Sequence, residues 1–313
     1  ISGVSSRAGR VPDIINCIVP YSDDLLLFGG DKSIWRMTGD PMAGGQLDLV
    51  TEQTGMGWGR PYTKDPNGVL YFYGSRGSVY RWVPGQPVPQ RISMRSVERR
   101  VQDIDQSKYY ARLVWSNRDE GLHVFQVPFN GQWATSGSGS LVKHWFYEAK
   151  TDAWWEDQYA TVAVQPTAAT IIDGDQSADR KILIAGEDGR VRYIDSAATD
   201  DDASESASAI DSYVDIGPLI PGNQAGEFVY QHPEVWLAND RGSAHMQLLG
   251  GDEPEDQDLK HERTLHPGRN GPMLVRARAD QMYMRLRSAA SGESWAFEKA
   301  SIYVASGGMK RAR

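Results

Sequence analysis

The sequence predicts an all-β protein with β-propeller-like repeats of about 44 residues, followed by a C-terminal antiparallel β-sheet or sandwich region. The first observation is a recurring hairpin pattern. A short apolar run meets a Gly-containing turn, and a second run that carries an aromatic residue leaves it. Clear copies occupy residues 23–36, 69–82 and 181–194, and looser versions occupy residues 111–125 and 141–155.

The second observation is the spacing of these hairpins. The first three start near Leu26, Leu70 and Leu113, roughly 44 residues apart, and the blades of β-propellers recur every 40–50 residues or so. One hairpin with two further strands in each period would make a four-stranded blade. Composition is the third observation: ten Trp, fourteen Tyr and thirty-two Gly, with few long helical patterns, are typical of strands joined by Gly-rich turns.

The chain is predicted to divide near residue 205. Residues 199–208 are too polar and acidic to be buried, which indicates a loop or linker. We therefore expect propeller-like repeats over residues 1–205 and an antiparallel β region over residues 206–313, which could close or pack on the propeller. The sequence starts at Ile1 rather than Met, so we expect the native start to be missing.

Charge and composition exclude several classes of function. The net charge is −8 and the pI is about 5.3, so no overall basic field attracts nucleic acid. Cys17 is the only cysteine, which excludes an internal disulfide and a cysteine-based zinc site. No apolar run approaches the 18–20 or so residues that span a bilayer.

The chemical motifs are weak, and we expect no catalytic, cofactor-binding or metal site. His261 and His266 flank a Glu but are five residues apart, whereas a zinc protease needs two His four apart on a helix. Residues 173–179 alternate oxygen ligands without the Gly and Glu of a calcium loop. Residues 55–61 are rich in Gly but precede no helix, so an inter-blade turn is favoured over a phosphate loop.

Residues 116–121 approximate the Ser-x-Asp-x-Gly turn of sialidase-like propellers, with one extra residue. Those turns are structural even in the enzymes that carry them. Glycoside cleavage usually needs a carboxylate pair across a pocket, and 41 acidic residues do not reveal which pair that would be.

Two groups of residues are candidates for a subunit interface. Arg276, Arg278, Arg285 and Arg287 alternate with apolar residues, so each pair would project from one face of its strand and could meet an acidic neighbour; a solvated sheet face explains the pattern equally well. Trp154 and Trp155 belong to an aromatic-rich stretch over residues 109–155. Core packing between blades is the favoured interpretation of that stretch, and stacking on sugars is the alternative.

Three groups of segments carry a family resemblance: residues 5–12 with 25–28, 33–35 and 39–41; residues 68–82 with 91–93; and the Arg-rich ending over residues 285–313. Together they resemble the structural tail proteins of tailed bacteriophages, especially the propeller-containing nozzle or hub proteins of short-tailed phages. The likeness lies in the general sequence pattern over most of the chain, without an invariant motif.

The resemblance implies a non-enzymatic virion component, assembled in the host cytoplasm and then part of the phage tail. It implies a homo-oligomeric ring, usually a hexamer, around the DNA channel below the portal and adaptor. The expected partners are adaptor and portal-proximal tail proteins, tail fibres, and genome DNA that passes during ejection without sequence-specific binding. No cofactor is expected. The alternative hypothesis is a carbohydrate-binding or sugar-cleaving β-propeller.

Overall fold

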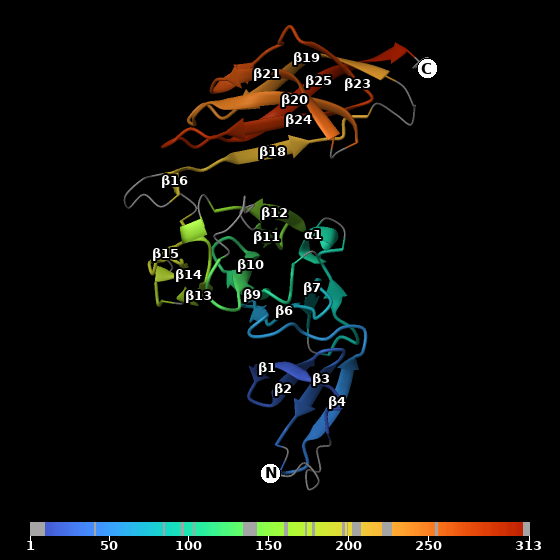
Figure 1. Ribbon diagram of the computed structural model, residues 1–313, viewed down its shortest axis with the longest axis vertical. Coiled ribbons are helices and arrows are strands. Elements are labelled where there is room, and N and C mark those ends of the chain that lie inside the picture. Colours follow the sequence, from blue (N-terminus) through green and yellow to red (C-terminus); the bar gives the residue numbers. More distant parts are fainter. Residues whose placement is uncertain are drawn as a thin grey trace. The chain divides into compact units, whose positions relative to one another are not determined.

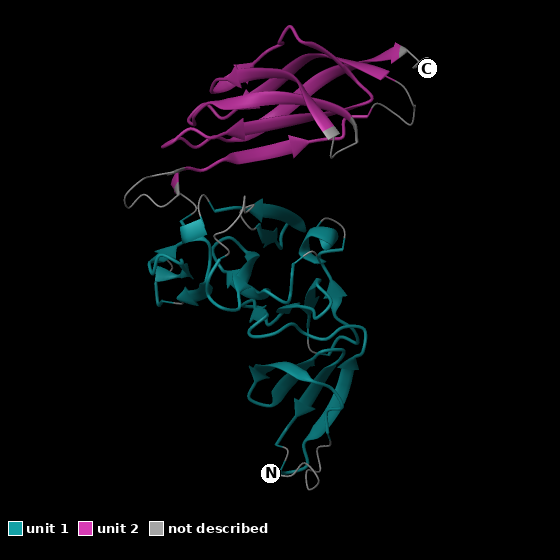
Figure 2. Ribbon diagram, in the orientation of Figure 1, with its two compact units in different colours: residues 1–196 teal, residues 197–313 magenta. Residues whose placement is uncertain are grey.

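The structure of the protein is a computed structural model. The structure describes residues 10–40, 42–83, 85–94, 97–102, 104–133, 143–159, 162–172, 174–176, 179–195, 198, 200–201, 208–220, 227–253 and 256–308. The chain forms two compact units, Ile1–Ser196 and Ala197–Arg313, which Figure 2 distinguishes by colour. The division falls a few residues before the boundary expected near 205.

The described residues of the first unit form four successive antiparallel sheets (Figure 1). Their strands are β1 (Ile15–Ser22), β2 (Leu25–Gly30), β3 (Ile34–Thr38) and β4 (Gln46–Thr51); β5 (Tyr62–Lys64), β6 (Leu70–Tyr73), β7 (Val79–Trp82) and β8 (Gln90–Arg91); β9 (Tyr109–Ser116), β10 (Gly121–Pro128), β11 (His144–Glu148) and β12 (Ala153–Asp157); and β13 (Ala168–Ile172), β14 (Lys181–Ala185) and β15 (Val191–Tyr193). In each sheet the strands pair in chain order, as in a meander.

Hydrophobic layers lie between successive sheets, and alternation along the strands creates them. On β6, Leu70 and Phe72 pack in the layer shared with the first sheet, whereas Tyr71 and Tyr73 pack in the layer shared with the third. Successive side chains of a strand point to opposite faces, so a strand between two layers is apolar on both sides. All four residues of β6 are buried for this reason.

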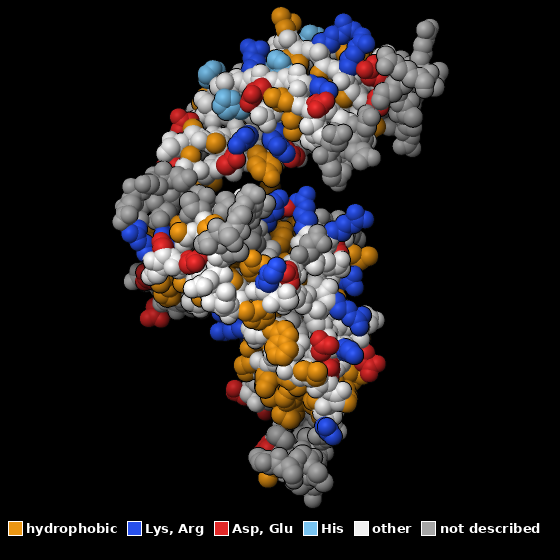
Figure 3. Space-filling model, in the orientation of Figure 1, with side chains coloured by type: hydrophobic (Ala, Val, Ile, Leu, Met, Phe, Trp, Pro, Cys, Tyr) orange, Lys and Arg blue, Asp and Glu red, His pale blue; other side chains and the backbone are white. Residues whose placement is uncertain are grey.

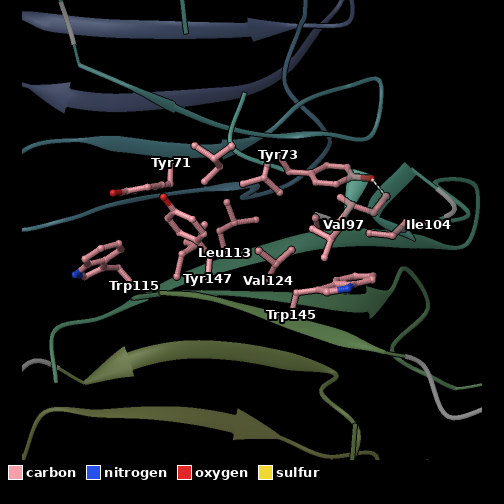
Figure 4. Packing of buried hydrophobic residues seen from close by; sticks show 14 residues of the cluster. Tyr71, Tyr73, Val97, Ile104, Leu113, Trp115, Val124, Trp145 and Tyr147 are labelled. Carbon is pink, nitrogen blue, oxygen red and sulfur yellow. Dashed lines mark hydrogen bonds between the residues drawn. The ribbon is translucent and has the colours of Figure 1, made fainter. Parts of the chain in front are cut away.

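The layer between the second and third sheets is shown in Figure 4, where Tyr71 and Tyr73 face Leu113, Val124 and Trp145. One edge of this layer is closed by the short helix α1 (Glu98–Gln102), which buries Val101. The Tyr73 hydroxyl donates a hydrogen bond of 3.0 Å to the Val101 carbonyl. No helix among the described residues is long and apolar enough to cross a membrane.

The predicted repeat is present, but its phase in the third copy was wrong. Leu26 and Leu70 lie on β2 and β6, the second strands of their sheets, whereas Leu113 lies on β9, the first strand of its sheet. In a meander every pair of adjacent strands is a hairpin, so the hairpin pattern does not reveal which pair it marks.

The second unit is an antiparallel sandwich. One sheet has the order β18-β24-β20-β21; in the other, β19 pairs with β22, β23 and β25. The strands are β18 (Ser212–Ile216), β19 (Glu227–Leu237), β20 (Ala244–Glu253), β21 (Asp256–Leu265), β22 (Gly268–Asn270), β23 (Arg276–Ala279), β24 (Gln281–Ser288) and β25 (Phe297–Gly308); a two-residue ladder, β16 (Asp200–Asp201) with β17 (Ser208–Ala209), precedes them.

Alternation again explains the core of this sandwich. Met246 and Leu248 of β20 and Met284 of β24 point inward, and Tyr230 and Val235 of the facing strand β19 meet them. The predicted fold class is therefore confirmed: the chain is all-β, with propeller-like repeats followed by an antiparallel sandwich.

Candidate functional site

The candidate site lies on the outer face of the sheet β18-β24-β20-β21. Because Met284 and Leu286 of β24 are buried in the core, the alternating Arg285 and Arg287 point away from it. On β20, the buried Met246 is flanked by His245, which is exposed, and Gln247, which is partly buried.

The strand register places these outward residues in two rows across the sheet. The first row runs Tyr213, Arg287, His245 and Thr264, and the second runs Asp215, Arg285, Gln247 and Glu262. Directly opposite residues of antiparallel strands have Cβ atoms about 4.5–5.5 Å apart. Residues that are 74 positions apart in the chain, such as Tyr213 and Arg287, are therefore neighbours on this face.

Hydrogen bonds hold this face in one arrangement. Arg285 donates from Nε and Nη2 to the two oxygens of Asp215 at 2.7 and 2.8 Å, and Arg287 pairs with Asp211 in the same way at 2.6 and 2.7 Å. Hydrogen bonding to these aspartates raises the pKa of both guanidinium groups. Bidentate pairing fixes the planes of the arginine side chains.

A groove of about 400 Å³ opens on this face. Its lining comes from three strands, the residue before β20 and the loop before β25: Ser243, His245, Gln247, Glu262, Arg287, Ser288, Ala289, Ala290 and Glu293. Gln247 Nε2 donates to Glu262 Oε1 at 2.9 Å. Figure 3 shows acidic and basic side chains interspersed on the visible face of this unit.

The loop that forms one wall is anchored at several points. The Gly292 amide donates to the carboxylate of Asp200 at 2.9 and 3.0 Å, and Trp295 Nε1 donates to Ser212 Oγ at 2.7 Å. Through these bonds the groove is built before any ligand arrives, which is the usual condition of small-molecule sites.

The four arginines predicted as an interface group do not share one face. Arg285 and Arg287 lie beside the groove, paired with Asp215 and Asp211. Arg276 and Arg278 are exposed on β23, in the other sheet of the sandwich, where Arg278 lies 3.8 Å from Glu227. The pairwise projection from each strand was predicted correctly, and a role in subunit contacts stays a prediction.

The two tryptophans of the predicted interface differ in burial. Trp154 packs on Tyr147 with ring centroids 5.0 Å apart and donates from Nε1 to the Ile92 carbonyl at 3.2 Å. Trp155 is 49% exposed. The core-packing interpretation of the aromatic stretch is confirmed for Trp115, Trp133 and Trp145, which are buried.

The weak motifs lie apart from one another. His261 is on β21 and His266 follows its end. Ser116 and Asp119 bond to each other in the turn before β10, as a structural turn requires. In the part of the chain that the structure describes, no group of three or more His, Cys, Asp or Glu could hold a metal. Asp173, Ser177 and Ala178 of the acidic turn lie outside the described residues.

Comparison with known proteins gives structural neighbours only. No family model matches the sequence, and no curated protein is significantly similar to it. An exo-β-1,3-galactanase from Phanerochaete chrysosporium, solved with β-1,3-galactotriose, is 11% identical over 91% of this chain and 80% of its own, with a TM-score of 0.31. A second structure, described as a glycoside hydrolase, is 9% identical over 89% of this chain and 81% of its own, with a TM-score of 0.27.

A third neighbour, a protein of unknown function from Bacteroides thetaiotaomicron, is 11% identical over 60% of this chain and 63% of its own, with a TM-score of 0.26. Such values concern the fold and carry no argument about activity. The main functional prediction, a tail nozzle or hub component, is corrected: the neighbours named above include glycoside hydrolases, and none of them is described as a tail protein.

The correction has a physical reason. The segments that carried the resemblance, such as residues 25–28 and 33–35, are strands and turns of the stacked sheets. Any stack of antiparallel sheets needs apolar strands and Gly-rich turns of this kind, so the shared sequence pattern reflects the fold rather than a role. Nothing in the comparisons concerns oligomeric state, partners or location, and those expectations stay predictions.

Proposed function

We propose that this protein binds a carbohydrate in the groove on the outer face of the sheet β18-β24-β20-β21. The observation that carries the proposal is the lining: hydrogen-bond donors and acceptors from separate strands meet in one prebuilt groove of about 400 Å³. That volume lies within the range of small-ligand sites, about 300–1,000 Å³.

The chemistry of the lining matches sugar hydroxyls. A hydroxyl group donates one hydrogen bond and accepts others. Arg287, Gln247 and His245 supply donors, while Glu262 and Glu293 supply acceptors. An alternating set of this kind suits a neutral polyhydroxylated ligand.

The charges of the groove disfavour anions. Arg287 is committed to Asp211, and its neighbour Arg285 to Asp215. Glu262 and Glu293 add two further negative charges to the lining. A phosphate or an acidic sugar would therefore meet more negative than positive charge here, whereas a neutral sugar would not be repelled.

The test is a glycan array probed with the full chain, followed by titration calorimetry with the best glycan. The wild type is expected to bind a neutral glycan. Glu262→Gln is expected to raise the dissociation constant about tenfold, which corresponds to a loss of roughly 1.4 kcal/mol of binding free energy. Glu298→Gln removes the same charge from an exposed position on strand β25, outside the groove, and is expected to leave the affinity unchanged.

Two results would reject the proposal: no glycan bound at any position of the array, or equal weakening by the two substitutions.

The same bound glycan serves to test the prediction that the chain is not an enzyme. Glu262 and Glu293 are both carboxylates of the groove, and glycoside cleavage uses a carboxylate pair. Reducing ends released by the wild type and lost in Glu262→Gln would show hydrolysis; unchanged glycan would show binding alone.

A further inference from the structure

A second, independent feature lies in the first unit, where the first strands of three sheets meet. Strand β9 lies against both β5 and β13. Near the start of β9, Arg112 Nε donates to the Ala169 carbonyl of β13 at 2.7 Å. This hydrogen bond fixes the guanidinium group of Arg112 beside the starts of these strands.

The loop before β5 brings a second arginine to the same place. Arg60 lies over the Tyr62 ring, 5.9 Å from its centroid. The preceding Gly59 has a positive φ of 83°, and a Cβ at that position would lie 3.5 Å from the ring of Tyr110 on β9. The loop of the second sheet therefore passes directly against the first strand of the third sheet.

The charges of these two arginines are not compensated. Among the described residues no carboxylate pairs with Arg60 or Arg112, although the chain has more acidic than basic residues. Burial lowers the pKa of Arg112, and the positive charge of Arg60 lowers it further. By contrast, Arg285 and Arg287 each have a bidentate aspartate.

An uncompensated, half-buried guanidinium is costly unless something pairs with it. Arg112 is only partly buried, and within the described residues its Nη groups have no protein acceptor, so they can donate to a ligand. Guanidinium groups pair with oxyanions through two parallel hydrogen bonds. Next to Arg112, Tyr110 packs on Phe129 with centroids 5.3 Å apart, and Phe129 is 51% exposed, which provides an apolar flank.

From this juxtaposition we propose that Arg112 and Arg60 form a binding site for an oxyanion, a carboxylate or sulfate group that is either part of an acidic sugar or free in solution. Arg112 supplies a fixed guanidinium group that can donate two parallel hydrogen bonds. Arg60 supplies a second positive charge from the loop before β5. The site is independent of the neutral-sugar groove of the other unit, so either can fail without the other.

The experiment titrates the full chain at low ionic strength with glucuronate, galacturonate, galactose 6-sulfate and inorganic sulfate, with neutral galactose as the blank. Saturable binding of at least one anion is expected, weakened about tenfold by Arg112→Gln and by Arg60→Gln. Arg76→Gln is the matched control, because Arg76 is an exposed arginine on the β6–β7 turn, and less than a twofold change is expected there.

The arms separate the two sources of the anion. Acidic sugars that bind more tightly than inorganic sulfate would assign the site to a sugar-borne anion, and equal affinity would assign it to a free one. Arg112→Lys, which keeps the charge but not the guanidinium group, is expected to bind more weakly than wild type and more tightly than Arg112→Gln. Should Arg112→Gln not fold, Arg60→Gln in the exposed loop decides the matter.

Absence of saturable binding for every anion would overturn the proposal. So would an affinity for neutral galactose equal to that for the anions, or an Arg60→Gln variant that binds as the wild type does.

Discussion

At the scale of single residues, two buried histidines make the stability of the protein sensitive to pH. His123 stacks on Phe125 and packs on Phe146, and neither of its ring nitrogens has a hydrogen-bond partner among the described residues. His144 accepts a hydrogen bond of 3.1 Å at Nδ1 from the backbone amide of Gln126. Burial lowers the pKa of His123 to about 4 and that of His144 to about 3.

We predict that the free energy of unfolding falls as the pH drops from about 6.5 towards 4. Above pH 6.5 the histidines are neutral in both states; below it the unfolded chain takes up protons that the folded chain does not. Each histidine contributes a slope of up to about 1.4 kcal/mol per pH unit. Urea denaturation at half-unit pH intervals measures that slope.

The substitution His123→Phe isolates one of the two contributions. Phe keeps the stacking on Phe125 and removes two unpaired nitrogens, so stability at pH 7 is expected to be unchanged or higher. The slope below pH 6.5 is expected to fall by up to about 1.4 kcal/mol per pH unit. Nearby Asp119 raises the pKa of His123 and reduces this effect. A variant with the wild-type slope would show that His123 does not titrate on unfolding.

At the scale of elements, β10 illustrates how tightly the sheets are stacked. All eight of its residues are buried, with Leu122 and Val124 in one layer and Phe125 and Val127 in the next. Its first residue, Gly121, leaves no room for a side chain: an added Cβ would overlap the Phe146 ring and lie 2.7 Å from the Tyr147 carbonyl oxygen.

Gly121→Ala is therefore predicted to destabilise the first unit by about 1–3 kcal/mol, the usual cost of overpacking. The midpoint of urea denaturation measures the loss. Adding Phe146→Leu should recover part of it, because the ring is one of the two obstacles. An alanine variant as stable as the wild type would mean that β10 and β11 can separate at this end without cost.

The elements also show what the sequence could and could not predict. The alternation of Arg285 and Arg287 with apolar residues correctly predicted their outward projection, because alternation is a local property of a strand. It did not predict that Asp215 and Asp211 pair with them, since this depends on the register between β18 and β24. The groove was missed for the same reason: Gln247, Glu262 and Glu293 have no shared motif and meet only through strand pairing.

The site formed by Arg112 and Arg60 was not predicted either, because it also depends on contacts between distant parts of the chain. Nothing near either residue in the sequence distinguishes it from the other arginines. The distinguishing property is that no carboxylate among the described residues pairs with either arginine, and this appears only after β5, β9 and β13 are brought together. By contrast, the fold class followed from local hairpin signals, which need no knowledge of distant residues.

At the scale of the whole molecule, each unit has a core of its own. The core of the second unit comes from residues between Val214 and Val304 alone. We predict that a fragment of residues 197–313 folds by itself and that calorimetry of the full chain shows two transitions, one of which matches the fragment. A fragment with the circular dichroism of an unfolded chain would contradict this.

Cys17 gives the first hydrophobic layer a chemical consequence. Its side chain is 6% exposed, Sγ lies 3.6 Å from Met56 Sδ, and burial raises the pKa of the thiol to about 12. The reactive thiolate is therefore almost absent while the first two sheets are in contact. Cys17 is the only cysteine. The rate at which a thiol reagent labels the protein therefore reports how often those two sheets separate, whatever happens in the rest of the protein.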